Sequence, residues 1–179
     1  NGRRTSEINA LGSTNGYAYS ERDDLIGITN ELSFSSSATY DSYGQPLTVI
    51  DAMGFGTTNG YDSKGNTVAT TNGLSIVSRY GYDSQGNRKA ETNAFGLNEQ
   101  STTHFDYDHY GYLTNVTDAL ENKTAYTYDA NGNRLTERHE RTLPSGSKQT
   151  IWTTNLYDAA NRVVAVIDPD GFTNRTIFN

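Results

Sequence analysis

The sequence predicts an all-β fold made of repeated antiparallel β-hairpins, and three observations lead to that prediction. The 179 residues include 13 Tyr and about two dozen Thr, both of which favour strands. A Tyr-Asp dipeptide recurs along the chain at a nearly constant interval, which indicates a repeat architecture. Alternating strand-like segments such as 124–128 are followed by Asp-, Asn- and Gly-rich turn signals such as 129–132. We expect the hairpins to pair edge to edge into a continuous, coiling β-sheet ribbon.

The repeat is about 21 residues long, because successive Tyr-Asp dipeptides are 21, 21, 25, 21 and 29 residues apart. A Gly follows four residues after most of these tyrosines, an Asn or Asp eleven residues after, and in some repeats a second Gly fourteen residues after. We expect about eight partial or complete repeats over residues 1–179, and we interpret the chain as a window of a longer array. The repeat motif comprises Tyr19, Tyr40, Asp41, Gly44, Tyr61, Asp62, Gly65, Tyr82, Asp83, Gly86, Tyr107, Asp108, Gly111, Tyr128, Asp129, Gly132, Tyr157, Asp158 and Asn161.

Each repeat is predicted to contain two strands and two turns. Asp suits the first position of a type I turn, and Gly suits the following position with positive φ. Asn161 replaces that Gly in one repeat and is the residue that best tolerates the conformation. The Asn or Asp at position eleven, as in Asp51–Gly54, marks the second turn. The two longer steps predict extra residues near Leu97–Ser101 and a loop tip at Leu143–Gly146.

Composition and motifs exclude several classes of function. The chain has no Cys, and its acidic pI of about 4.8 argues against a nucleic-acid-binding groove. Its longest apolar run, Val163–Ile167, is far too short to span a membrane. His104, His109 and His139 lack zinc-site spacing, and no nucleophile motif occurs. We therefore expect no enzymatic activity, no cofactor, no metal and no nucleic-acid partner.

The tyrosines allow two interpretations. In strands they are expected to pack against cross-strand neighbours. Tyr43, Tyr110 and Tyr112 lie at or beside predicted hairpin tips, where exposed rings could instead stack on sugars. These three residues are the candidate glycan contacts.

The segment Tyr128-Asp129-Ala-Asn-Gly132-Asn-Arg-Leu-Thr136 resembles the YD repeat of rearrangement-hotspot (Rhs) proteins, and residues 118–129 resemble its other half. The same repeat occurs in bacterial wall-associated proteins, in the shell of insecticidal toxin complexes and in animal teneurins. The resemblance implies a non-enzymatic structural module of a large secreted or cell-surface bacterial protein, located outside the cell. Its flanking repeats would form the wall of a hollow shell that encloses or presents a C-terminal toxin or effector.

Two other functions stay open at this point: a cell-surface adhesin or glycan-binding array, and a subunit of a β-solenoid-like extracellular filament. The filament would form by self-association through open sheet edges, which are ready templates for strand pairing. The segment Asp168–Gly171 resembles a short form of a cleavage segment found in Rhs shells. Its Asp and Gly also fall on the repeat's turn positions, which favours a turn.

Overall fold

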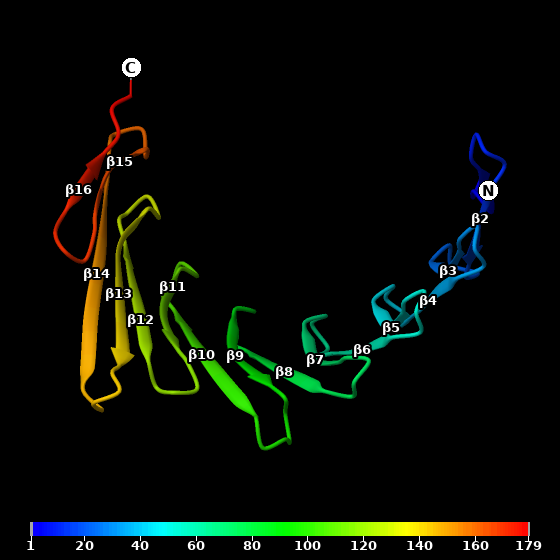
Figure 1. The fold of residues 1–179 in the computed structure, drawn as a ribbon, viewed down its shortest axis with the longest axis horizontal. Helices are drawn as coiled ribbons and strands as arrows, with labels where there is room; N and C mark the ends of the chain where they lie inside the picture. The colour runs from blue at the N-terminus through cyan, green and yellow to red at the C-terminus, as the bar shows by residue number, and fades with distance from the viewer. Residues whose placement is uncertain (1, 179) are drawn as a thin grey trace. The chain divides into compact units, whose positions relative to one another are not determined.

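The computed structural model describes residues 2–178 and contains sixteen strands and no helix among them. Strand order in the sheet follows chain order, and consecutive strands form antiparallel hairpins, so the predicted all-β hairpin fold is confirmed (Figure 1). The strands are β1 (Ser6–Ile8), β2 (Thr14–Tyr19), β3 (Leu25–Thr29), β4 (Ser35–Tyr40), β5 (Pro46–Ile50), β6 (Gly56–Tyr61), β7 (Thr67–Thr71), β8 (Val77–Tyr82), β9 (Arg88–Asn93), β10 (Ser101–Tyr107), β11 (Leu113–Thr117), β12 (Lys123–Tyr128), β13 (Arg134–Thr142), β14 (Lys148–Tyr157), β15 (Val163–Ile167) and β16 (Thr173–Arg175).

The chain divides into two compact units. One contains the residues up to Tyr80 together with Asn93–Asn98, and the other contains Gly81–Thr92 together with the residues from Glu99 onward. Both units are built from the same repeating hairpin, so each can be described by its turns and by the contacts between neighbouring hairpins.

The Tyr-Asp tips share one five-residue turn, which Asp41–Gln45 illustrates. The backbone N–H of Asp41 donates to the carbonyl of Gln45 at 2.9 Å, and the N–H of Gly44 donates to the carbonyl of Asp41 at 3.3 Å. The Asp41 carboxylate accepts the N–H groups of Tyr43 and Gln45 at 2.8 and 2.9 Å. Gly44 has a φ of 83°, a conformation in which a Cβ is strained. The Asp-x-x-Gly spacing therefore encodes the turn directly.

The turns at the opposite ends of the hairpins have the same geometry even where the sequence lacks Gly. The side-chain oxygen of Asn72 accepts the N–H groups of Leu74 and Ile76, both at 3.0 Å. Ser75 then takes a φ of 62° without being glycine, and Ser33 and Glu121 do the same at 65° and 60°. The Asn or Asp at the start of the turn is thus sufficient to hold a non-glycine residue in a left-handed conformation.

The two insertions affect the turns differently. Between β9 and β10, Asn93 lies eleven residues after Tyr82, the position from which a second turn is predicted to start. That prediction is wrong here, because Asn93 ends β9 and the turn bond runs from the N–H of Leu97 to the carbonyl of Ala94 at 3.0 Å. The extra residues shift the turn by one position. Between β13 and β14 the insertion instead lengthens both strands, and the turn bond of Gly146 to Leu143 at 2.8 Å closes the predicted tip.

Burial is low throughout the part of the chain that the structure describes. Ala165 is its one buried hydrophobic residue, and no polar or charged residue there is buried. Most strand residues are half-buried, as expected where a sheet packs through neighbouring strands without a second layer. The contacts between adjacent hairpins therefore carry most of the structure's cohesion.

Candidate functional site

The repeat tyrosines lie at the ends of the strands that lead into the Tyr-Asp tips, and all of them are half-buried. The hydroxyls of five of them reach back to the preceding hairpin. Tyr61 on β6 donates to the carbonyl of Pro46, the first residue of β5, at 2.9 Å, and Tyr128 on β12 donates to the carbonyl of Leu113 on β11 at 2.8 Å. Tyr19, Tyr40 and Tyr157 make equivalent bonds at 3.0 to 3.1 Å.

This tyrosine bond supplies a donor where the ladder between neighbouring hairpins stops. Leu113 lies beside the bulge of its own hairpin, where the register of β10 with β11 shifts between Asp106 and Tyr107. The ladder between β11 and β12 begins only at Asn115, two residues into β11. The carbonyl of Leu113 therefore needs another donor, and the tyrosine hydroxyl supplies it. Each such tyrosine joins one hairpin to the next.

Neighbouring tips also contact each other. The Gln45 amide Nε2 donates to the carbonyl of Gly65 in the following tip at 3.0 Å. In the second unit, Asn133 Nδ2 donates to Asn161 Oδ1 at 2.7 Å, again from one tip to the next. The Tyr112 side chain lies directly over Gly132, so closely that an added Cβ would overlap its hydroxyl.

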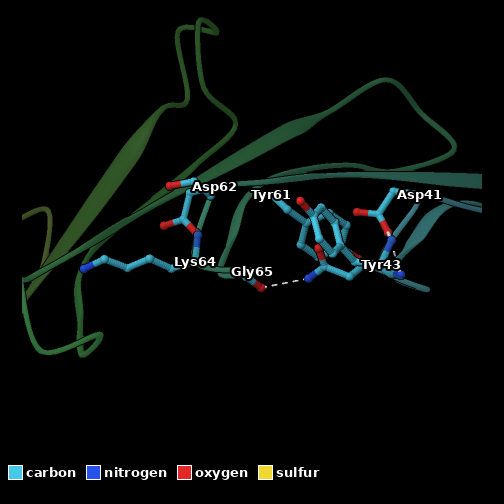
Figure 2. A pocket seen from close by; sticks show the side chains of 8 residues that line it. Asp41, Tyr43, Tyr61, Asp62, Lys64 and Gly65 are labelled. Atoms are coloured by element: carbon cyan, nitrogen blue, oxygen red, sulfur yellow. Dashed lines mark hydrogen bonds between the residues drawn. The ribbon is translucent and has the colours of Figure 1, made fainter.

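Two grooves lie between consecutive tips, one in each unit, at equivalent positions of the repeat. The first has a volume of about 620 Å³ and lies between the tips that begin at Asp41 and Asp62. Figure 2 shows the rings of Tyr43 and Tyr61 in this groove, with Lys64 extending away from them. Tyr43 is 89% exposed, whereas Tyr61 is half-buried.

The second groove is richer in aromatic rings. It has a volume of about 520 Å³ and is lined by Tyr110, Tyr112, Tyr126 and Tyr128. The Tyr112 and Tyr128 rings stack with centroids 5.0 Å apart, and the Tyr110 ring lies 6.2 Å from Tyr112. Tyr110 is 73% exposed and Tyr112 36%. The groove thus offers a graded set of rings, from a half-buried base to an exposed rim.

The carboxylates beside the grooves are held in their ionised form by the turns. The Asn66 side-chain amide, and then its backbone N–H, hold the pKa of Asp62 below its usual value. Asn133 does the same for the pKa of Asp129, primarily through its side-chain amide. Burial raises the pKa values of the Tyr126 and Tyr128 phenols. The two carboxylates are therefore ionised hydrogen-bond acceptors, and the two phenols are neutral.

The structure thus places the sequence-predicted residues in two roles. The motif Asp and Gly residues form the tips, where Gly44, Gly65, Gly86, Gly111 and Gly132 have φ between 83° and 91° and Asn161 has 60°. Tyr43 lines the first groove, and Tyr110 and Tyr112 line the second. Sequence reasoning missed that the motif tyrosines Tyr61 and Tyr128 also line the grooves, although their fixed spacing from the tips could have indicated it.

Other candidate sites are not formed by the described residues. His104, His109 and His139 lie on separate strands or turns, and residues 2–178 contain no group of three or more His, Asp or Glu that could hold a metal ion. His109 lies at a tip and contacts the Tyr110 ring at 3.7 Å between centroids. No helix among the described residues is long and apolar enough to cross a membrane.

Comparisons with known proteins give a family and a fold. Residues 61–97 and 107–148 match the family described as RHS Repeat. A Tc holotoxin pore of Photorhabdus luminescens carrying a TccC3 mutation matches with a TM-score of 0.72 and 13% identity, over 91% of this chain and 9% of that chain. The TcdB2–TccC3–Cdc42 complex matches at 0.58, and TcdB2–TccC3 without its hypervariable C-terminal region at 0.55, both with 13% identity, 97% of this chain and 12% of theirs.

The chain therefore spans only about a tenth of the length of the solved chains that it matches. At this identity the likeness concerns the fold alone. No curated protein matches the sequence.

Proposed function

We propose that this chain, which carries Rhs, or YD, repeats over residues 61–97 and 107–148, is a non-enzymatic structural module of a large secreted or cell-surface bacterial protein. Its sheet forms part of the wall of a β-sheet shell, and the shell encloses or presents a C-terminal toxin or effector. Residues 1–179 act as one array whose partners are the flanking repeats of the same polypeptide.

The hydrogen bonds made by the repeated Tyr and Asp residues carry this proposal. The tyrosine hydroxyls, as in Tyr61 and Tyr128, bond the preceding hairpin, and the Asp carboxylates, as in Asp62 and Asp129, accept the N–H groups of their own tips. The polar groups of the repeat thus form its tips and join one hairpin to the next. That is what a wall built from many identical units requires.

The electrostatics also favour a structural role. A general acid at neutral pH needs a carboxyl group whose pKa is raised. The pKa values of Asp62 and Asp129 are instead lowered, because hydrogen bonds from Asn66 and Asn133 stabilise the ionised forms. Carboxylates with this bonding serve as turn anchors. The likeness of the fold to chains of Tc toxin complexes supports the shell interpretation.

Protection from proteolysis tests the shell. The native polypeptide that carries these repeats is treated with a broad-specificity protease, and cleavage of its C-terminal segment is followed by mass spectrometry. We expect that segment to survive until denaturant opens the shell, whereas the same segment expressed alone is digested at once. Digestion of both at the same rate would contradict the proposal.

A second candidate function, glycan binding, is favoured by the aromatic groove of the second unit. Exposed Tyr110 and stacked Tyr112 and Tyr128 present ring faces next to polar groups, which suits the apolar face of a sugar ring. A glycan array tests this role with the chain, the variants Tyr110→Ala and Tyr43→Ala, and Leu120→Ala as an exposed control outside the grooves. Binding lost only in the tyrosine variants supports it, and no binding at millimolar sugar counts against it.

A further inference from the structure

The two sets of turns differ sharply in the residue at their third position. In the first unit, the turns that join β1 to β2, β3 to β4, β5 to β6 and β7 to β8 place a large apolar residue there. These residues, which we call the apolar turn row, are Leu11, Leu32, Met53 and Leu74. They are 92%, 70%, 80% and 73% exposed. Turn tips usually carry polar residues, so a repeated apolar tip is unexpected.

The opposite turn edge of the same unit lacks this feature. Its third-position residues are Arg22, Tyr43 and Lys64, two of which are charged. Both sets of turns share one backbone geometry and one pattern of side-chain to backbone bonds. The apolar residues are therefore not required by the turn itself.

The row is widened by the last residue of two of the turns. Phe34 and Phe55 occupy that position and are 53% and 55% exposed. The Phe55 ring lies against the next turn, since an added Cβ on Gly73 would be 3.2 Å from it. Phe95 and Leu97, in the connection between β9 and β10, add two further apolar side chains that are 39% and 49% exposed.

The exposed area is large enough for a specific interface. With roughly 150 to 200 Å² for each large apolar side chain, the exposed fractions of these eight residues amount to roughly 770 to 1,000 Å². A standard protein interface buries about 800 Å² on each partner. The largest apolar patch on a typical monomer is about 300–600 Å². This edge therefore exceeds what a soluble surface ordinarily leaves uncovered.

The spacing and the area of the row both suit a second copy of the chain. Each step crosses two strands, so successive tips are about 10 Å apart. A second copy carries a row with the same period and with the area that a stable dimer needs. We propose that the apolar turn row pairs with the apolar turn row of a second copy of this chain, in a two-fold arrangement that places Leu11 opposite Leu74 and Leu32 opposite Met53. A two-fold interface buries the same patch on both partners.

This contact differs from strand pairing at the open ends of the sheet, because it uses side chains at the turns and leaves the backbone groups of β1 and β16 unused. It does not depend on the shell proposal, since it concerns the chain in solution. Sedimentation equilibrium of the full chain from about 1 to about 100 µM tests it, a range in which interfaces of this size associate. We expect a monomer–dimer equilibrium.

The decisive variant replaces the centre of the row with charge: Leu32→Lys, Met53→Lys and Leu74→Lys together. Burying unpaired charge in an apolar interface is costly, so the dimer dissociation constant should rise at least about a hundredfold. Far-UV circular dichroism and a thermal melt establish that the variant is folded, because these side chains are exposed and make few contacts.

A matched control carries the same change in net charge on the opposite turn edge of the first unit, with Glu21→Gln, Ser42→Lys and Ser63→Lys, and should dimerise like the parent chain. Because the chain has no Cys, Met53→Cys can also carry a single spin label, whose paired distance should be short in the dimer. A parent chain that stays monomeric overturns the proposal and leaves the row to another partner. A dimer that survives the row variant overturns the proposal as well, whatever the control variant does.

Discussion

Removing one tyrosine hydroxyl tests the bond between hairpins. Tyr128→Phe keeps the ring and its 5.0 Å stacking on Tyr112 but removes the 2.8 Å bond to the Leu113 carbonyl. A typical intramolecular hydrogen bond contributes about 1 kcal/mol, and the unpaired half-buried carbonyl adds to the cost. We therefore expect a loss of about 1 to 2 kcal/mol. For a chain of this length that corresponds to about 2–8 °C in melting temperature.

The matched control is Tyr43→Phe, which removes a hydroxyl from a side chain that is 89% exposed. Urea unfolding followed by circular dichroism should give no change in stability beyond about 0.5 kcal/mol for this variant. Hydrogen exchange should show faster exchange in β11 and β12 for Tyr128→Phe alone. Equal stability of the two variants would refute the idea that the repeat tyrosines join neighbouring hairpins.

Three further predictions concern the turns. Gly12→Ala should destabilise the chain by about 1 kcal/mol through backbone strain alone, because no other residue lies near the added Cβ. Gly132→Ala should cost more than this, because its Cβ displaces the Tyr112 ring, and equal losses in urea unfolding would argue against that contact. Glu121→Gly should raise the melting temperature, because glycine relieves a φ of 60°, and a lower value would contradict the turn account. The pKa of Asp129 is lower in the folded chain than its usual value of 3.8, so its contribution is complete above that pH and is lost as the pH falls through the lowered value. Asp129→Asn should therefore lose less stability between pH 7 and acid than the parent chain, and an unchanged pH profile would contradict this.

Much of the fold could be predicted because its turns are encoded locally. An Asp or Asn at the start of a turn and a Gly three residues later, as in Asp41 and Gly44, determine the bonds and the backbone conformation within five residues. The alternating strands between them then have only their neighbours to pair with. The all-β hairpin order follows from these two features.

The remaining features depend on contacts between repeats, and sequence patterns do not show them. The Tyr61 hydroxyl bonds the Pro46 carbonyl where the ladder between β5 and β6 is missing, because that ladder begins only at Thr48, two residues further along β5. Ser75 and Glu121 adopt positive φ because Asn72 and Asp118 bond the turn around them, which propensity alone would not indicate.

The candidate site was predicted only in part for the same reason. The exposed rings of Tyr43 and Tyr110 follow from their position at tips, but the grooves form only where consecutive tips lie next to each other. The half-buried Tyr128 that stacks under Tyr112 comes from the next repeat. A groove between repeats becomes visible only when the pairing of hairpins is known.

Electron microscopy of the native particle, combined with the intact mass of its polypeptide, distinguishes a shell from a filament. We expect a closed hollow body with density inside it, formed by a polypeptide several times longer than these 179 residues. In that body the hairpins described here should lie side by side within the wall. A particle without an enclosed cavity, or a periodic fibre whose repeat matches this chain, would contradict the shell and make the array a filament subunit instead.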